Sequence, residues 1–241
     1  MKKRIYLLLL SVVAIFPSCR DNSGDFVEQL FTDAQISIAL RDCLYLASDS
    51  TLRTLCVLDE HVPEFGYYLF DILNYRIELP ADAKQIIDTL GEYGFVEILD
   101  TLIFDINQAA ELCGTKLNKE LESAIKLLQF PDPKLILHGG KNAATIFFKE
   151  KHKEEFISLL VTTVLLEQFN ELHIFARWNE LQENYFQITG KYSSIDILTP
   201  AAQQMLAGYF KLMTLVEEAI RNNPKLRGKS DSLLNKVFET Q

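Results

Sequence analysis

The sequence is poor in the residues that interrupt helices. It has only 10 glycines and 7 prolines among 241 residues, so long stretches lack the strongest helix breakers. Within these stretches apolar residues recur every three or four positions, which is the helical period. The sequence therefore predicts an all-α protein, with a multi-helix, bundle-like single domain over residues 26–241 and no internal repeat.

The short motifs of common enzyme and metal sites are missing. The chain contains no HExxH, GxSxG, GxGxxG or CxxC, whose spacings hold metals, nucleophiles, phosphates or redox thiols. His152 and Glu155 have the spacing of a helical metal pair, but no third ligand is near in sequence and charged residues surround them, which favours a solvated face. We expect no metal and no cofactor, and we name no catalytic residue.

A complete phosphate loop is missing as well. The segment HGGKNAAT, residues 138–145, has glycines and a lysine before a helix start. A Walker loop needs the longer GxxxxGKS/T so that its backbone wraps the phosphates, whereas Lys141 directly follows the glycine pair. The segment is instead predicted to end one helix and begin another, which Asn142 caps.

Basic residues are fewer than acidic ones. The chain has 24 Lys and Arg against 33 Asp and Glu, a net charge of −9, so we expect no nucleic-acid partner. The exception is a basic cluster of Arg221, Lys225, Arg227 and Lys229 at a helix end. It has two interpretations: compensation of the helix dipole, or a docking point for an anionic group or an acidic partner surface. Glu217 and Arg221, four residues apart, are predicted to form a surface ion pair.

The N-terminus has the layout of an export signal. Lys2, Lys3 and Arg4 precede an apolar run, residues 5–16, that is too short to span a membrane. The following Ser18-Cys19 pair resembles a bacterial lipobox. We predict a signal peptide over 1–18, lipid attachment at Cys19 and a tether to residue 25. An ordinary secretory signal is the alternative.

This N-terminus predicts a location. Acylation of Cys19 would anchor the mature chain, of net charge −12 after the loss of three basic residues, in the bacterial cell envelope. We expect the outer membrane, at its periplasmic face or surface, with the lipid as the membrane contact. Of the remaining thiols, Cys43 and Cys56 lie about 20 Å apart on one predicted helix, too far to pair. Buried apolar thiols are favoured for Cys43, Cys56 and Cys113, and the pairing of two of them is left open.

Helical patterns cover most of the predicted domain. In residues 96–113 the expected buried seam contains Val96, Leu99, Ile103, Ile106, Ala110 and Cys113, with Asn107 off the seam. The β-branched run at 161–164 is predicted as helix because the apolar pattern continues at helical spacing. Segment 58–80 is ambiguous between helix and extended chain. The other expected helices are 32–55 with a Thr32–Gln35 capping box, 82–90, 118–130, a short one after Pro133 that reaches Leu137, one beginning at Asn142, one beginning at Thr199-Pro200 and ending at 222, and 230–238.

Five segments carry a resemblance to a known family. They are residues 39–55, 77–80 (IELP), 107–110 (NQAA), 143–149 and 208–238. With these segments the chain resembles the bacterial domain-of-unknown-function family 4197. The resemblance implies an exported, often lipidated helical protein with no established activity. It adds weight to Asn107, Glu218, Arg221 and Arg227 as candidate binding residues without giving them roles.

Three function hypotheses follow. The first is a non-catalytic envelope lipoprotein that binds or scaffolds a protein partner. The second is a binder of a lipid or other apolar small molecule in a cavity between helices, for which the aromatic residues are the motivation. The third is a hydrolase of unknown substrate, with a site around Asn107, Glu218 and Arg221, which requires these side chains to reach one substrate.

Overall fold

The computed structural model describes residues 31–56 and 66–239. The chain divides into two units, residues 1–30 and 31–241. The described part of the second unit is all-α and contains no strand. The predicted signal peptide, Cys19 and the tether lie outside the described residues.

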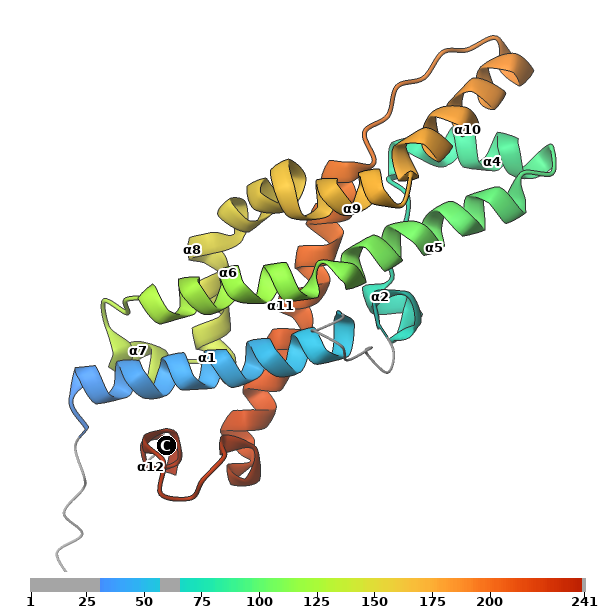
Figure 1. The fold of residues 1–241 in the computed structure, drawn as a ribbon. Coiled ribbons are helices and arrows are strands. Elements are labelled where there is room, and N and C mark those ends of the chain that lie inside the picture. Colours follow the sequence, from blue (N-terminus) through green and yellow to red (C-terminus); the bar gives the residue numbers. More distant parts are fainter. Residues whose placement is uncertain (1–30, 57–65, 240–241) are drawn as a thin grey trace, which may run out of the picture. The chain divides into compact units, whose positions relative to one another are not determined.

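Two long helices, α1 (Asp33–Leu55) and α11 (Leu198–Asn222), cross each other and form the centre of the domain (Figure 1). The start of α1 confirms the predicted capping box, because Thr32 accepts the N–H of Gln35 and the Gln35 side chain accepts the N–H of Thr32. The start of α11 differs from the prediction. The Asp196 carboxylate accepts the N–H groups of Leu198 and Thr199, so the helix begins two residues before Pro200.

The ambiguous segment resolves into short helices and an extended strip where it is described. They are α2 (Gly66–Leu69) and α3 (Ile72–Tyr75), followed by extended residues 76–80 and a 3₁₀ turn (Ala81–Ala83). Gly66 is required at the start of α2. Its φ is +65°, and a Cβ there would lie 2.2 Å from the Glu111 carboxylate.

Helices α4 (Lys84–Glu92) and α5 (Val96–Leu112) form a hairpin whose turn contains Gly94 at φ +93°. Helix α6 (Gly114–Leu127) follows almost directly and lies beside α1 (Figure 1). It begins four residues before the predicted start, because the chain stays helical through Cys113.

The second half of the chain adds α7 (Pro133–Leu137), α8 (Ala143–Leu159), α9 (Leu165–Glu171) and α10 (Ile174–Thr189). The β-branched run is helical, as predicted, and forms a π turn (Leu160–Val164) between α8 and α9. His173, with φ +56°, separates α9 from α10 and is exposed. An ion pair between Arg177 and Asp105 joins α10 to α5.

After α11 the chain makes a 3₁₀ turn (Pro224–Arg227) and ends in α12 (Leu233–Glu239), which packs on α1. The predicted last helix therefore begins three residues later than expected. Cys43, Cys56 and Cys113 are buried free thiols, which confirms their interpretation as small apolar side chains.

The predicted seam of α5 was wrong at two positions. Val96 is 53% exposed, whereas Asn107 is fully buried. The predicted Leu99, Ile106 and Ala110 are buried, and Leu102 and Ala109, which the seam did not include, are buried with them. Asn107 is buried because α5 packs against several elements, α2, α4, α9 and α10 among them, so its buried surface is wider than one stripe.

Candidate functional site

The ion pair of Glu217 and Arg221 is buried, and the prediction of a surface pair was wrong. The Glu217 side chain is 0% exposed and that of Arg221 is 3% exposed, with 2.8 Å between Oε1 and Nε. The helical period explains this, because Glu217 follows buried Met213 by four residues and precedes buried Ile220 by three. This spacing is visible in the sequence, but Glu217 was not assigned to the core because carboxylates are rarely fully buried in proteins.

The Glu217 carboxylate also caps another helix. Its Oε1 accepts the N–H of Ala144 at 3.2 Å, and its Oε2 accepts the N–H of Thr145 at 2.7 Å. The predicted cap, Asn142, occupies the N-cap position of α8 but makes no side-chain hydrogen bond there. A negative charge at a helix N-terminus is favourable, so a carboxylate from α11 holds the start of α8 in place.

Arg221 continues the connection to α7. Its Nη1 donates to the Leu137 carbonyl at 2.8 Å, and its Nη2 donates to the Ile136 carbonyl at 3.4 Å. The pair therefore ties the end of α7 and the start of α8 to α11. In this way the HGGKNAAT segment, predicted as a helix end followed by a helix start, is held at both of its ends by one buried ion pair.

Arg227 closes the end of α11. Its Nε donates to the Ile220 carbonyl at 2.9 Å and its Nη2 donates to the Arg221 carbonyl. The guanidinium carbon atoms of Arg221 and Arg227 lie 4.9 and 5.7 Å from the centre of the Phe238 ring. Positive charge at a helix C-terminus offsets the dipole, which is the first of the two interpretations of the basic cluster.

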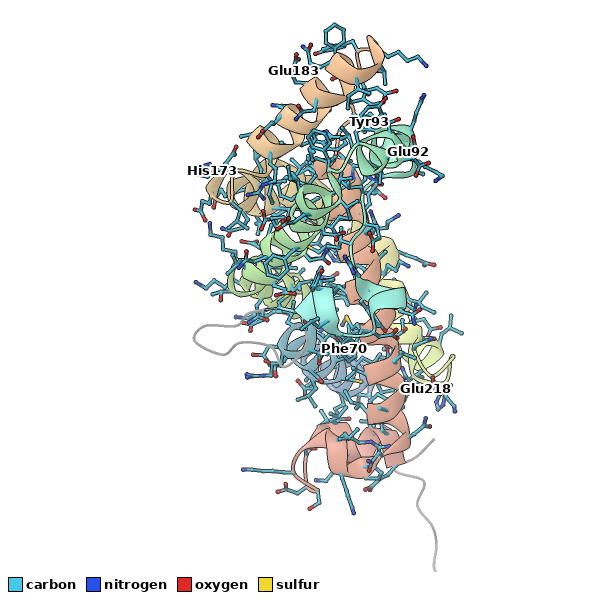
Figure 2. All side chains as sticks on the ribbon, turned by 90° about the vertical axis from the view of Figure 1, so that its right-hand side faces the viewer. Phe70, Glu92, Tyr93, His173, Glu183 and Glu218 are labelled. Atoms are coloured by element: carbon cyan, nitrogen blue, oxygen red, sulfur yellow. The ribbon has the colours of Figure 1, made fainter. Side chains whose placement is uncertain are left out.

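Glu218, the other acidic residue of this turn, is at the surface (Figure 2). The Lys141 ammonium lies 3.2 Å from its Oε1, and the side chains are 63% and 40% exposed. Exposed pairs of this kind contribute little to stability.

Asn107 lies in a different part of the fold. Its Oδ1 accepts the N–H of Ile77, and its Nδ2 donates to the carbonyls of Ile77 and Ile103, each at 2.8 Å. The amide thus pairs with the extended IELP segment, as a neighbouring strand would.

The separation of Asn107 from Arg221 follows from the length of α11. Glu78, next to Ile77, exchanges hydrogen bonds with Gln204. At 1.5 Å per residue, Arg221 lies about 25 Å further along the helix axis. The structure therefore brings Arg221 and Arg227 together. It places Glu218 beside Lys141 and leaves Asn107 in another part of the fold.

A pocket of about 480 Å³ adjoins the basic cluster at the end of α11. We call it the C-terminal pocket. It is lined by Gly139, Lys141, Arg221, Asn222, Pro224, Arg227, Phe238 and Glu239. Among the described residues of this lining, three of the four charged side chains are cationic.

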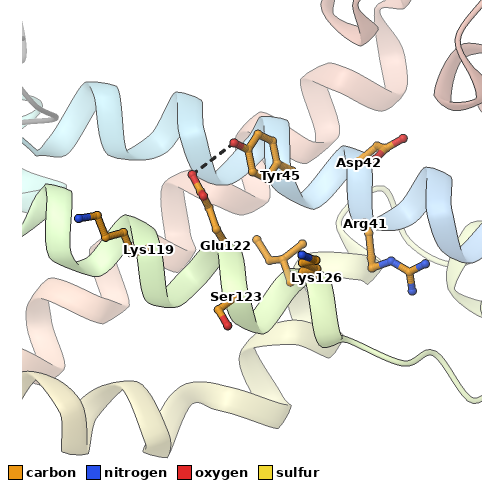
Figure 3. A pocket seen from close by; sticks show the side chains of 8 residues that line it. Arg41, Asp42, Tyr45, Lys119, Glu122, Ser123 and Lys126 are labelled. Atoms are coloured by element: carbon orange, nitrogen blue, oxygen red, sulfur yellow. Dashed lines mark hydrogen bonds between the residues drawn. The ribbon is translucent and has the colours of Figure 1, made fainter.

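A second pocket, of about 520 Å³, lies between α1 and α6 (Figure 3). The Tyr45 hydroxyl donates to Glu122 at 3.3 Å, and Arg41 donates to the Leu128 carbonyl at 3.0 Å. Burial raises the pKa of the Asp42 carboxyl. The Tyr45–Glu122 hydrogen bond joins α1 to α6 across this pocket, whose lining contains charged residues of both signs.

Sequence reasoning missed a groove on α5, which we call the α5 groove. It has a volume of about 700 Å³ and is lined by Tyr68, Gly94, Val96, Glu97, Asp100, Thr101 and Phe104. The five residues from α5 recur at helical spacing and form one stripe. Phe104 could have indicated this groove from the sequence, because it is an aromatic residue that lies outside the expected seam. Its exposed fraction in the structure is 44%.

A fourth pocket, of about 590 Å³, lies between the 80–81 turn, α8 and the N-terminal half of α11. Its lining includes Leu206, Ala207 and Phe210, with Lys149 and Lys153 also present. This pocket is the most apolar of the hollows between helices that we describe.

The histidines that the structure describes give no metal centre. His152 Nδ1 lies 2.9 Å from Glu155. The prediction of a solvated face holds for the Glu155 side chain, which is 73% exposed, but was wrong for His152, which is 16% exposed and packs on Phe148 and Phe156. Within residues 31–56 and 66–239, no three His, Cys, Asp or Glu side chains are placed to share a metal ion. No described helix combines the length and apolarity that crossing a bilayer requires.

Comparison with known proteins places the chain in a family. The family model described as protein of unknown function, DUF4197, matches residues 31–239. Neither the curated proteins nor the solved structures give a match. The matched region includes the buried ion pair, Asn107, the C-terminal pocket and the α5 groove. The chain therefore belongs to the DUF4197 family of proteins of unknown function.

Proposed function

We propose that this protein is a non-catalytic, lipid-anchored protein of the bacterial cell envelope that binds a protein partner through the α5 groove. The observation that carries the proposal is the exposed apolar and aromatic surface on α5. Val96 and Phe104 are 53% and 44% exposed and line a groove with Tyr68. Exposed apolar surface of this kind is typical of interaction sites.

The aromatic side of the groove is held in position before any partner binds. Tyr68 and Phe104 meet edge to face, with 5.1 Å between ring centres. The guanidinium carbon of Arg76 lies over the Tyr68 ring, 4.4 Å from the ring centre. Glu111 accepts the Tyr68 N–H at 3.1 Å. Aromatic anchors with fixed geometry lose little conformational freedom on binding and are enriched at interface hot spots.

The charges around the groove favour a partner with basic groups. Glu97 and Asp100 line the groove, and both side chains are exposed. Arg76 is engaged with Tyr68 and lies 3.2 Å from Glu78. An acidic lining around an apolar centre complements a protein segment that carries Lys or Arg beside apolar side chains.

The anchor of the proposed function is the lipid on Cys19. Its support is the basic, apolar and Ser-Cys order of the N-terminal segment. Acylation would hold the domain at the outer membrane and so confine its partner search to the envelope. Cys19→Ala is expected to release the protein from membranes, as measured by fractionation. The mass of the N-terminal peptide of the wild-type chain should include acyl groups.

Site-specific crosslinking tests the groove. A photoreactive amino acid is placed at Val96, or as a control at Leu127, which is 73% exposed at the end of α6. We expect one protein adduct from position 96 in intact cells and none from position 127. Adding Phe104→Ala should abolish the adduct while the helical content is unchanged. Equal capture from both positions, or an adduct that Phe104→Ala does not affect, would contradict the proposal.

A second candidate function is binding of a lipid or apolar small molecule in the fourth pocket. The observation in its favour is the apolar surface of Leu206, Ala207 and Phe210 beside two lysines, which suits an apolar chain with an anionic group. Native mass spectrometry of the purified protein should then detect a bound ligand. The exposed position of Ala207 allows a matched variant, Ala207→Trp, which should reduce the ligand-bound fraction by filling the pocket.

A further inference from the structure

We infer that the C-terminal pocket binds a small oxyanion, a carboxylate or a phosphate, with Arg227 as its main ligand. This site is separate from the α5 groove and does not depend on the proposed partner. The inference starts from an unpaired donor. Arg227 is 5% exposed, and its buried Nη1 has no hydrogen-bond partner among the described residues.

The unpaired nitrogen is the part of Arg227 that the fold leaves unused. Nε and Nη2 are bound to carbonyls at the end of α11. A buried charged donor without a partner is costly, and native structures usually satisfy such groups with protein, water or a ligand. An oxyanion is a strong acceptor for guanidinium N–H groups.

The pocket supplies further positive charge. Lys141 and Arg221 line it together with Arg227, and within the part of the chain that the structure describes Glu239 is the one carboxylate of the lining. Glu218 lies beside Lys141, and the charge of Glu217 is offset by Arg221 and two backbone N–H groups. Positive charge is therefore concentrated at this pocket, although the chain as a whole has a net charge of −9.

The C-terminus of α11 repels an anion less strongly than the helix dipole alone would predict. A helix C-terminus exposes carbonyl oxygens, which repel negative charge. Here Arg227 covers the carbonyls of Ile220 and Arg221, and the Asn223 N–H donates to the Ala219 carbonyl. Phe238 packs under both guanidinium groups and holds them in place. The pocket is of a size typical for small-molecule sites, about 300–1,000 Å³.

Calorimetric titration of the full chain with inorganic phosphate and with acetate tests the inference. Both are measured at constant ionic strength, with chloride as the reference anion. We expect saturable binding of one anion per chain, and the tighter anion identifies the source as phosphate or carboxylate. Absence of saturable binding for both, or equal binding of chloride, would overturn the inference.

Variants locate the binding. Arg227→Gln should weaken it at least tenfold, but Arg227 also closes α11, so this variant alone could report unfolding. Lys141→Gln removes a positive charge from an exposed residue, and we expect a severalfold loss of affinity. Glu239→Gln removes the lining carboxylate, and we expect tighter binding. Lys236→Gln is the matched control on α12, because Lys236 is exposed and does not line the pocket.

The direction in which each substitution changes the anion affinity decides whether the inference holds. Weaker binding in Lys141→Gln and tighter binding in Glu239→Gln, with Lys236→Gln unchanged, support the assignment. A purely structural role for Arg227 would move the melting temperature without moving these affinities. Identical affinities in all three exposed variants would therefore overturn the inference even if Arg227→Gln did not fold.

Discussion

Glu217 and Thr145 lie 72 residues apart in the sequence, yet the carboxylate of one accepts the backbone N–H of the other at 2.7 Å. The contact places a charged side chain of α11 at the first turn of α8. Together with Arg221 it replaces a local cap by a tertiary one. The joint between α7, α8 and α11 thus depends on a buried ion pair whose remaining bonds all go to backbone groups.

Removing one partner of this pair should be strongly destabilising. Glu217→Gln leaves Arg221 buried without its counter-charge, and we expect a loss of about 3 kcal/mol in the free energy of unfolding. Urea denaturation followed by circular dichroism measures it. Glu218→Gln, on the exposed neighbour, should change stability by less than about 0.5 kcal/mol. Equal effects of the two substitutions would contradict the buried role of Glu217.

Asn107 should matter for stability because it pairs with the Ile77 backbone. Asn107→Ala leaves a buried N–H and a buried carbonyl of Ile77 without their partner, with an expected cost of about 2 kcal/mol. Asn170 is a matched control, since its amide also donates to a carbonyl four residues earlier but is exposed. Asn170→Ala should be close to neutral in the same denaturation experiment. A near-neutral Asn107→Ala would show that water replaces the amide.

Two glycines with positive φ should respond differently to alanine. At Gly66 a Cβ would collide with the Glu111 carboxylate, whereas at Gly190, with φ +70°, a Cβ meets nothing within 4 Å. Gly190→Ala should cost about 1 kcal/mol from backbone strain alone. Gly66→Ala should cost more, because Glu111 must move and release the Tyr68 N–H. If the two variants had the same thermal stability, the close approach at Gly66 would be contradicted.

Alkaline pH should destabilise the fold through the buried thiols and phenols. Burial raises the pKa of Cys113 from 9.0 to about 12, and it also raises the pKa values of Cys56 and Tyr67. Above pH 9 the unfolded chain releases the Cys113 proton while the folded chain keeps it. Stability that is fully present below pH 9 is therefore lost as pH rises toward 12, by about 1.4 kcal/mol per pH unit for each such proton.

The measurement is the free energy of unfolding in urea between pH 7 and 11. Cys113→Ala should show a shallower decline than the wild-type chain, because one of the coupled protons has been removed. A decline of equal slope in both proteins would assign the pH dependence to other groups. At pH 8 the three described thiols should react with a thiol reagent only after unfolding.

Much of the helical structure was predictable because it depends on local interactions. The helical period and the Thr32–Gln35 capping box placed α1 closely, and the glycine pair placed the end of α7. The residues of the basic cluster were also evident, since their charge contrasts with that of the whole chain. The predicted helix boundaries were less accurate where the capping residue had not been identified. At the start of α11, for example, the Asp196 carboxylate caps the helix two residues earlier than predicted.

The candidate sites could be predicted only in part. Arg221 and Arg227 were singled out, but the unpaired nitrogen of Arg227 depends on where two carbonyls of α11 lie. Asn107 was placed off the buried seam because its partner, the Ile77 backbone, comes from an extended segment with no periodic signal. Val96 was placed in the core because periodicity identifies apolar faces but not which of them a neighbour covers.

The sequence by itself determined that the chain is all-α, where most helices lie, and that it carries an N-terminal segment with the pattern of a lipoprotein signal. These properties follow from local propensity, spacing and the order of residues. Only the tertiary structure decided that Glu217 caps α8, that Asn107 faces Ile77 and that Val96 and Phe104 remain exposed. The reason is physical: burial and hydrogen-bond partners are set by elements far apart in the chain, and no local pattern records which of them meet.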